Sequence, residues 1–414
     1  MEGQQPPQPP PEGVHYPSLR ATAAGLFSLV AIAATGLAAG PAAAGPAART
    51  CALPRTDAHH SLGLDTWNAA YPRPARALDA VMVFLSFPDA TPHAGTEEIA
   101  ADYFPDTSRF FERASYGRFS LRAHPRHGWL RMPRPSTAYA IQRDWEPSRR
   151  AAYLRDALAV ADPVVDFSRY DIVYLVADPD APGVDSDATK VVNLETPLRA
   201  DGRDVRRLVT LFERHPPDRN VLAHETGHVF DLPDLYHRPL DGEGDWDTHV
   251  GDWDVMGSQF ALAPEPFAWH KWKLGWLGER QVRCVRGEDL FTLEPVAAEP
   301  SAGTAAGTRL AVVRTGENSV LAIEARGATG NDRETCTEGV LIYRVRNETA
   351  SGGGPVEVVD AHPLTEACRD RSVYPPLADA PLGVGEVFTV PGEGTRVEVA
   401  DRTPTGAWTV RVTP

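Results

Sequence analysis

The segment Asn220-Val-Leu-Ala-His-Glu-Thr-Gly-His-Val-Phe-Asp-Leu-Pro-Asp-Leu-Tyr236 contains an HExxH pattern in apolar surroundings. On a helix, His224 and His228 are one turn apart on the same face, so both imidazoles can reach one metal ion. Glu225 projects beside them, where it can hold a water molecule without being a ligand. Burial of this helix is predicted from its apolar residues, which are Val221, Leu222, Val229 and Phe230.

A third ligand is expected soon after this helix, because catalytic zinc sites combine three protein ligands with one open position. Asp231 and Pro233 predict a turn, after which Asp234, ten residues beyond His224, can return to the metal. This spacing is the metzincin arrangement, whose turn usually has a glycine with positive φ. Asp231 stands there, and aspartate tolerates that region better than most residues. Competing third ligands are Glu243, His237, His249, Asp252 and Asp254.

Two features of this region have a purely structural alternative. The carboxylate of Asp234 can instead accept backbone hydrogen bonds within the turn. Further on, the segment Gly251-Asp-Trp-Asp-Val-Met-Gly257 predicts a tight turn that places Met256 beneath the metal, the other metzincin mark. A methionine can also simply fill a gap in the core.

Three segments together, HETGHVFDLPDLY, GDWDVMGS and Ala268-Trp-His-Lys-Trp-Lys-Leu-Gly-Trp-Leu277, resemble the immune inhibitor A-like family of secreted bacterial zinc metalloproteases. Further segments match the family in the same order along the chain. They are Phe87-Pro-Asp89 and Arg113-Ala-Ser-Tyr-Gly-Arg118 upstream, and the strand with Glu324 and the segment GVLIYRV downstream. The resemblance runs from about residue 80 to residue 360. It implies a zinc endopeptidase with His224 and His228 as ligands, Asp234 as the third ligand and Glu225 as general base.

The chain departs from the family pattern at several places. Asp231 replaces the usual glycine, and His237 replaces the aspartate that follows the tyrosine. Some metzincins have a tyrosine two residues after the methionine, where this chain has Ser258, so Tyr236 and His249 are the candidates for stabilising an oxyanion. The long propeptide that is common in the family is not expected here, because the predicted cleavage site lies close to the first expected strand.

Upstream of residue 212, helical and strand patterns alternate, which is typical of an α/β or α+β fold. We predict an α+β metzincin-like catalytic domain over residues 79–283, with a mixed sheet and the HExxH helix. Strands are expected at Ala80–Phe87, Phe119–Ala123, Tyr170–Ala177 and Arg207–Phe212, and helices at Thr96–Ala114 and Ser148–Val160. The strand expected at Arg207–Phe212 is a candidate sheet edge that could pair with an extended peptide.

Residues 284–414 have a different character. Short apolar segments of strand composition are separated by Gly, Pro, Asn and Asp, and no convincing helix is present. This pattern predicts an all-β sandwich domain. Its expected strands begin at Leu290, Thr308, Ser319, Gly339, Val356, Glu386, Arg396 and Ala407.

The N-terminus indicates export. An apolar run from Ala21 to Ala39 is followed by Ala42 and Ala44 in the small-x-small pattern of signal peptidase, so residues 1–44 are predicted to be a signal peptide. An uncleaved anchor is the alternative. Residues 45–78 are expected to form a flexible arm or a short pro-segment.

The four cysteines fit two disulfides in an oxidising compartment. We favour Cys336–Cys368, which are close in sequence, and this leaves Cys51–Cys284; four buried free thiols are the alternative. Cys51 could also cap a zinc ion from a short pro-arm, although a disulfide is favoured.

The net charge of −15 argues against nucleic acid as a partner and disfavours anionic membranes. We therefore expect a secreted, monomeric protein that binds one zinc ion and acts on proteins or peptides. Calcium could bind near Asp245, Asp247, Asp252 and Asp254, although a solvated loop explains these residues too. The alternatives are a zinc-binding adhesion protein without activity, a zinc amidase acting on cell-wall peptides, and a surface-binding module without metal.

Overall fold

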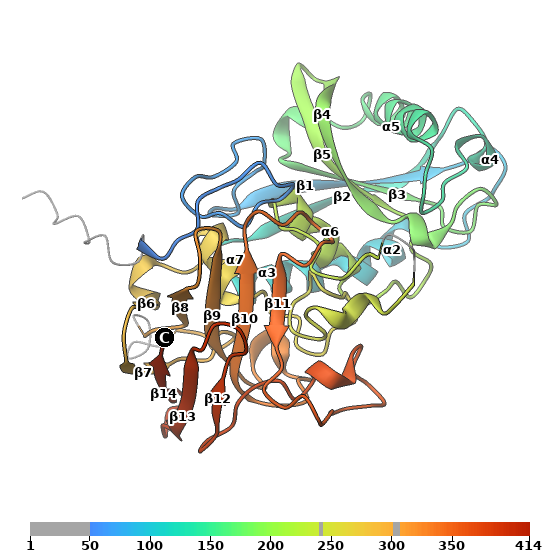
Figure 1. Cartoon of the computed structure of the whole chain (residues 1–414). Helices are drawn as coiled ribbons and strands as arrows, with labels where there is room; N and C mark the ends of the chain where they lie inside the picture. The colour runs from blue at the N-terminus through green and yellow to red at the C-terminus, as the bar shows by residue number, and fades with distance from the viewer. Residues whose placement is uncertain (1–49, 240–242, 301–306) are drawn as a thin grey trace, which may run out of the picture. The chain divides into compact units, whose positions relative to one another are not determined.

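The computed structural model describes residues 50–239, 243–300 and 307–414 (Figure 1). Residues Ala47–Pro414 form one compact unit that contains three β-sheets. The predicted signal peptide, residues 1–44, and the start of the predicted arm lie outside the described residues. Within the described part of the chain, no helix has the length and apolar character that crossing a membrane requires.

The first sheet is mixed and has the strand order β2-β1-β3-β5-β4. The pairs β1–β2, β1–β3 and β3–β5 are parallel, whereas β4 pairs with β5 in the antiparallel direction. The predicted strands are all present, and β4 was not predicted. The prediction that Arg207–Phe212 forms a sheet edge is wrong, because β4 covers that side of β5. The strands are β1 (Leu78–Ser86), β2 (Leu121–Arg131), β3 (Ile172–Ala177), β4 (Lys190–Ala200) and β5 (Arg203–Leu211).

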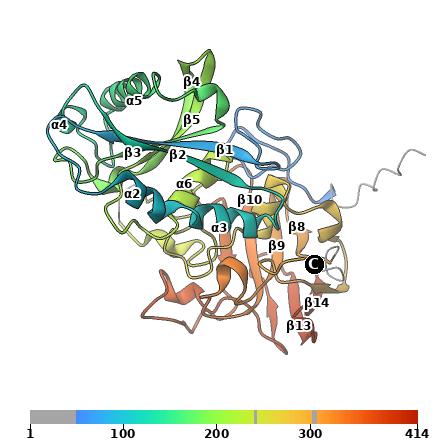
Figure 2. The same ribbon diagram turned by 180° about the vertical axis from the view of Figure 1, so that it is seen from behind.

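Helices cover both faces of this sheet (Figures 1 and 2). Alternate residues of β1 enter two cores: Met82 and Phe84 pack with α2, α3 and α6, whereas Val81 and Val83 pack with α5. The two cores arise because successive side chains of a strand point to opposite faces. The longer helices are α2 (Thr96–Tyr103), α3 (Asp106–Ala114), α5 (Pro147–Ala161) and α6 (Val221–Val229).

The single helix predicted for Thr96–Ala114 is two helices. The chain leaves the helical conformation at Phe104 and Pro105, because proline lacks the N–H that a helix interior needs and its ring clashes with the preceding turn. The helix predicted at Ser148–Val160 is confirmed as α5. Shorter helices are α4 (Ser136–Tyr139), α7 (Ala268–Leu274), η2 (Phe167–Arg169), η3 (Ser186–Ala188), η4 (Trp246–Thr248), η5 (Glu279–Gln281), η6 (Gly330–Asp332) and η7 (Pro375–Leu377).

The last third of the chain contributes two more sheets, with the orders β11-β10-β9-β8-β6 and β12-β13-β14-β7. The second of these is antiparallel throughout, whereas β6 and β8 pair in parallel in the first. All eight strands predicted after residue 284 are present. The strands are β6 (Val282–Val285), β7 (Asp289–Leu293), β8 (Leu310–Arg314), β9 (Ser319–Arg326), β10 (Gly339–Arg346), β11 (Val356–Val359), β12 (Val387–Thr389), β13 (Arg396–Arg402) and β14 (Trp408–Thr413).

The β9–β10 sheet is buried on both faces. On one face, Ala322 and Tyr343 share a core with helices α6 and α7. On the other face, Ile323 and Ile342 share a core with the antiparallel sheet. One apolar core therefore continues from the helical part into this sheet, and the boundary predicted at residues 283 and 284 stays a prediction.

The N-terminal arm is more ordered than its composition suggests. It has no helix or strand between residues 51 and 77, but Leu53 and Leu62 are fully buried in the main core. Cys51 is bonded to Cys284, and Cys336 to Cys368, so both predicted disulfides are confirmed. Two disulfides indicate an oxidising compartment. A role for this arm as a pro-segment stays a prediction.

Candidate metal centre

Helix α6 carries the HExxH pattern through the middle of the protein, and all nine of its residues are buried. It begins after Asn220, whose positive φ of 58° turns the chain into the helix. Thr226 fixes the helix to the sheet through a hydrogen bond of 3.0 Å between its hydroxyl and that of Tyr174 on β3. Burial of the whole helix and this hydrogen bond therefore restrain the helix that carries His224 and His228.

Hydrogen bonds orient both imidazoles. Nδ1 of His224 donates to the carbonyl of Val255, and Nδ1 of His228 donates to the carbonyl of Leu232, each at 2.8 Å. Because the ring proton is at Nδ1 in each bond, Nε2 of a neutral ring presents its lone pair to the site. Carbonyls commonly orient metal-binding histidines in this way.

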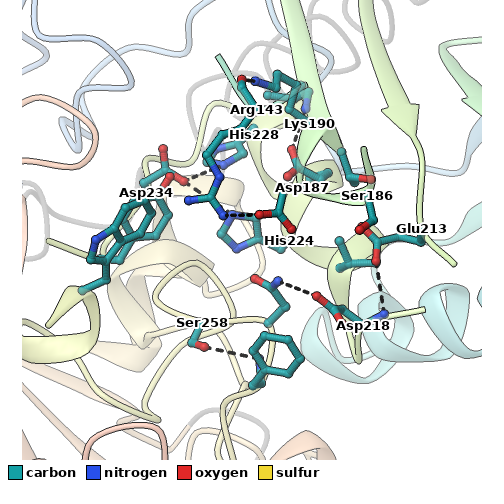
Figure 3. A pocket seen from close by; sticks show the side chains of 18 of the residues that line it. Arg143, Ser186, Asp187, Lys190, Glu213, Asp218, His224, His228, Asp234 and Ser258 are labelled. Carbon is teal, nitrogen blue, oxygen red and sulfur yellow. Dashed lines mark hydrogen bonds and ion pairs between the residues drawn. The ribbon is translucent and has the colours of Figure 1, made fainter. Parts of the chain in front are cut away.

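Asp234 completes a group of three. Its Oδ1 lies 3.4 Å from Nε2 of His224 and 2.9 Å from Nε2 of His228 (Figure 3). Apart from these two imidazole contacts, the buried Oδ1 has no hydrogen-bond partner in the described structure. The three ligand atoms lie within 4.8 Å of one another, and no other such group of His, Cys, Asp or Glu occurs among the residues that the structure describes. The structure thus brings together the three ligands predicted from the sequence, and two imidazoles with one carboxylate suit a divalent cation.

The closeness of these three side chains shifts the pKa values of His228 and Asp234 in the metal-free site. Burial alone would lower the pKa of His228, but attraction to Asp234 and a bond to its carboxylate raise it to about 9. Burial alone would raise the pKa of Asp234, but attraction to His228 and contacts with both imidazoles hold it well below its usual value. A proton on His228 therefore compensates the carboxylate when no cation does.

Glu225 lies next to the three candidate ligands but is not one of them. Its Oε2 accepts a 2.5 Å hydrogen bond from the backbone N–H of Val191 on the edge strand β4. Burial raises the pKa of its carboxyl, although the nearby imidazoles of His224 and His228 oppose the shift. The sequence did not predict this contact, because β4 itself was not predicted.

The turn after the helix has the backbone conformation that the metzincin spacing requires. Asp231 has a φ of +62°, as predicted. Its fully buried carboxylate accepts hydrogen bonds from Arg55 (2.8 Å) and His60 (2.9 Å), and Nζ of Lys273 lies 3.2 Å away. Three cationic or polar partners from distant segments thus hold a turn that a glycine usually forms.

Met256 is fully buried directly under α6. A β-carbon built on Gly227 would lie only 2.3 Å from the Met256 sulfur, so the helix can accept the methionine only where it has a glycine. The backbone N–H of Met256 donates to Asp254, and its carbonyl accepts from the N–H of Leu235. The turn under the two histidines, predicted from the sequence, is therefore tied to the segment that carries Asp234.

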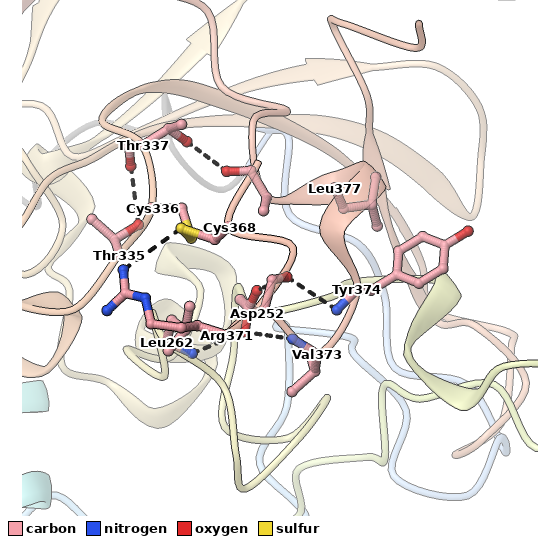
Figure 4. Close-up of a disulfide and its surroundings, with 12 residues drawn as sticks. Asp252, Leu262, Thr335, Cys336, Thr337, Cys368, Arg371, Val373, Tyr374 and Leu377 are labelled. Atoms are coloured by element: carbon pink, nitrogen blue, oxygen red, sulfur yellow. Dashed lines mark hydrogen bonds between the residues drawn. A yellow bond between two sulfur atoms is a disulfide. The ribbon is translucent and has the colours of Figure 1, made fainter. Parts of the chain in front are cut away.

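The other candidate third ligands lie outside this group of three. Asp254 accepts bonds from the backbone of Met256 and Phe267 and from His270, and Asp252 accepts bonds from Leu262, Ser372 and Val373 beside the Cys336–Cys368 disulfide (Figure 4). Within the described residues, the group that could hold a metal ion consists of His224, His228 and Asp234. It includes none of the other candidates, which are Glu243, His237, His249, Asp252 and Asp254. Asp245, Asp247, Asp252 and Asp254 likewise form no such group among the described residues, and calcium binding there stays a prediction.

The triad opens into a cleft of about 760 Å³. Tyr236 lines it, with its ring stacked against Trp246 at 5.3 Å, whereas His249 is not among the lining residues and packs against His237. Of the two candidates for an oxyanion contact, only Tyr236 therefore faces the cleft. Lys190 and Val191 of the edge strand β4 line it as well.

No model of a known protein family matches this chain, and a search of curated proteins finds no match either. What supports a functional assignment is therefore the arrangement of the site itself.

Proposed function

We propose that this protein is a secreted, monomeric zinc endopeptidase. The observation that supports this best is the convergence of His224, His228 and Asp234 beside a buried, non-ligand Glu225, in an open cleft. Three protein ligands with room for a fourth, non-protein ligand are typical of catalytic rather than structural zinc sites. The HExxH spacing, the positive φ of Asp231 and the methionine beneath the helix agree with the family resemblance.

Each residue has a specific role in this proposal. The two imidazoles and the Asp234 carboxylate would hold zinc, which supplies Lewis-acid polarisation of the scissile carbonyl and acidifies water. Glu225 takes a proton from the attacking water and passes it to the leaving amine. Burial suits Glu225 to this exchange, because its raised pKa lies closer to neutrality than that of an exposed glutamate.

The edge strand β4 favours an extended peptide as substrate. It ends the first sheet, and its residues Lys190 and Val191 line the cleft beside Glu225. A peptide that pairs with such an edge is held mainly by backbone hydrogen bonds, which are independent of side-chain identity. The intact Glu225 argues against an adhesion protein that merely binds zinc.

Removal of the metal tests the proposal. We expect the purified protein to contain one zinc ion, to lose cleavage of casein when a chelator removes the ion, and to recover it when zinc is added. A protein that holds zinc but cleaves neither casein nor cell-wall stem peptides would contradict catalysis. Cleavage of the cell-wall peptides alone would identify an amidase.

Zinc affinity should depend steeply on pH. Because the His228 pKa is about 9 in the metal-free protein, zinc must displace a proton from this ring at lower pH. The apparent affinity should therefore rise by about tenfold per pH unit up to pH 9. Competition with a chelator at pH 6, 7 and 8, corrected for protonation of the chelator, measures this. A constant affinity between pH 7 and 8 would show that His228 has an ordinary pKa.

A further inference from the structure

Asp234 lies beyond the end of helix α6, so the helix does not fix its side chain. Instead, the carboxylate contacts Ser351, which lies 117 residues further along the chain. The Ser351 hydroxyl donates a 2.9 Å hydrogen bond to Oδ2 of Asp234 and accepts a 2.8 Å hydrogen bond from the backbone N–H of the same residue. The N–H of Gly352 adds a 3.0 Å bond to the Asp234 carbonyl.

The two oxygens of the Asp234 carboxylate have different partners. Oδ2 is bonded to Ser351, whereas Oδ1 faces the two imidazoles and has no hydrogen-bond partner besides them in the described structure. Without the bond from Ser351, Oδ2 would lose this partner, and the terminal torsion of the carboxylate, which has broad energy wells, would be less restrained. Fixing a ligand before the ion arrives avoids that loss of entropy on binding.

The segment that carries Ser351 is itself anchored. It connects β10 to β11 and begins at Asn347, which is fully buried. The carbonyl of Asn347 accepts bonds from the hydroxyls of Thr56 and Ser61 in the N-terminal arm, at 2.6 and 2.9 Å. The N–H of Ser351 donates to the carbonyl of His59 in the same arm, at 3.3 Å. The serine is thus held between a sheet and the arm.

We propose that Ser351 is a positioning residue, which orients Asp234 so that one carboxylate oxygen binds the metal. The inference rests on the proposed metal site, but not on peptide cleavage. It assigns a role to the β10–β11 connection, which lies in the part of the chain predicted to be a separate β-sandwich domain. On this view, the C-terminal sheets help to build the metal centre.

The test compares zinc affinity in variants of the full chain, measured by chelator competition, with the absorption spectrum after cobalt substitution as a second readout. Ser351→Ala removes both side-chain bonds to Asp234, and we expect it to weaken zinc binding by about 10–100-fold. The same variant should shift the cobalt spectrum. Ser351→Thr retains the hydroxyl and should restore most of the affinity.

Ser372→Ala is the matched control. Ser372 also bonds a carboxylate from a distant part of the chain, that of Asp252, which is not in the metal group. It should lower the unfolding temperature of the metal-free protein at least as much as Ser351→Ala does, but leave zinc affinity and the cobalt spectrum unchanged. Wild-type affinity and spectrum in Ser351→Ala would overturn the proposal.

The two proposals fail separately in this design. If the wild type binds zinc and Ser351→Ala binds it weakly, the positioning role stands even when no peptide is cleaved. If both proteins bind zinc equally and the wild type cleaves peptides, the positioning role falls and the endopeptidase proposal stands. A wild type that binds no zinc overturns both.

Discussion

Glu225→Gln is expected to leave a folded protein that still binds zinc but cleaves peptides about 10²–10⁴-fold more slowly, the range that a general base contributes. The amide has nearly the same shape as the carboxyl but cannot accept the proton of the attacking water at neutral pH. The measurement is kcat on a peptide substrate, together with the zinc content of each preparation. Equal kcat values for the variant and the wild type would reject Glu225 as the base.

The structure indicates why this variant should fold. The carboxylate of Glu225 accepts one backbone hydrogen bond, from Val191, and the carbonyl oxygen of a glutamine can accept the same bond. Burial already disfavours the charge on Glu225, as its raised pKa shows, so a neutral group should cost little stability. Loss of activity with an unchanged unfolding temperature would therefore reflect chemistry.

Glu213→Gln provides a matched control for this experiment. Glu213 lines the same cleft, and burial raises its pKa too, but it is outside the HExxH pattern. The change in chemical group is identical, so a general effect of removing a negative charge from the cleft would appear in both variants. We expect Glu213→Gln to reduce kcat far less than Glu225→Gln. Comparable losses of kcat in the two variants would mean that the negative charge of the cleft, rather than proton transfer by Glu225, determines the rate.

Much of the site could be predicted because it is local. His224, Glu225, His228 and Asp234 lie within eleven residues, and helix periodicity followed by one turn determines their positions. The positive φ of Asp231 followed from the same short segment. The C-terminal strands were predictable for a similar reason, because short apolar segments between turn residues encode strands locally.

The contacts that brace the site could not be predicted, since they join distant segments. Ser351 lies 117 residues from Asp234, and Arg55 and His60 lie 176 and 171 residues from Asp231. No periodicity links such positions in a single sequence. The edge strand β4 was missed because Pro197 and several polar residues interrupt its apolar pattern. The helix break at Pro105 is different, because the proline is a visible local signal.

The bracing of Asp231 has a large energetic consequence. Its carboxylate is fully buried, and so are the charged end of Lys273 and the ring of His60, whereas Arg55 is partly exposed. Attraction to these groups outweighs the effect of burial and holds the pKa of Asp231 below its usual value. Removing one member of a buried ion pair typically costs about 3–5 kcal/mol, because the remaining charge stays buried without a partner.

Asp231→Asn should therefore lower the free energy of unfolding of the metal-free protein by about 3–5 kcal/mol, as measured by urea denaturation. Asparagine adopts positive φ as readily as aspartate, so the backbone contributes little to the loss. Asp201→Asn is the control, because Asp201 also has a positive φ, of 48°, but is exposed, and its one backbone hydrogen bond, from Phe167, can be accepted by an amide oxygen. Its effect should stay within about 0.5 kcal/mol, as for most surface substitutions. If the two variants were equally stable, the buried charges around Asp231 would contribute nothing to holding the turn between His228 and Asp234.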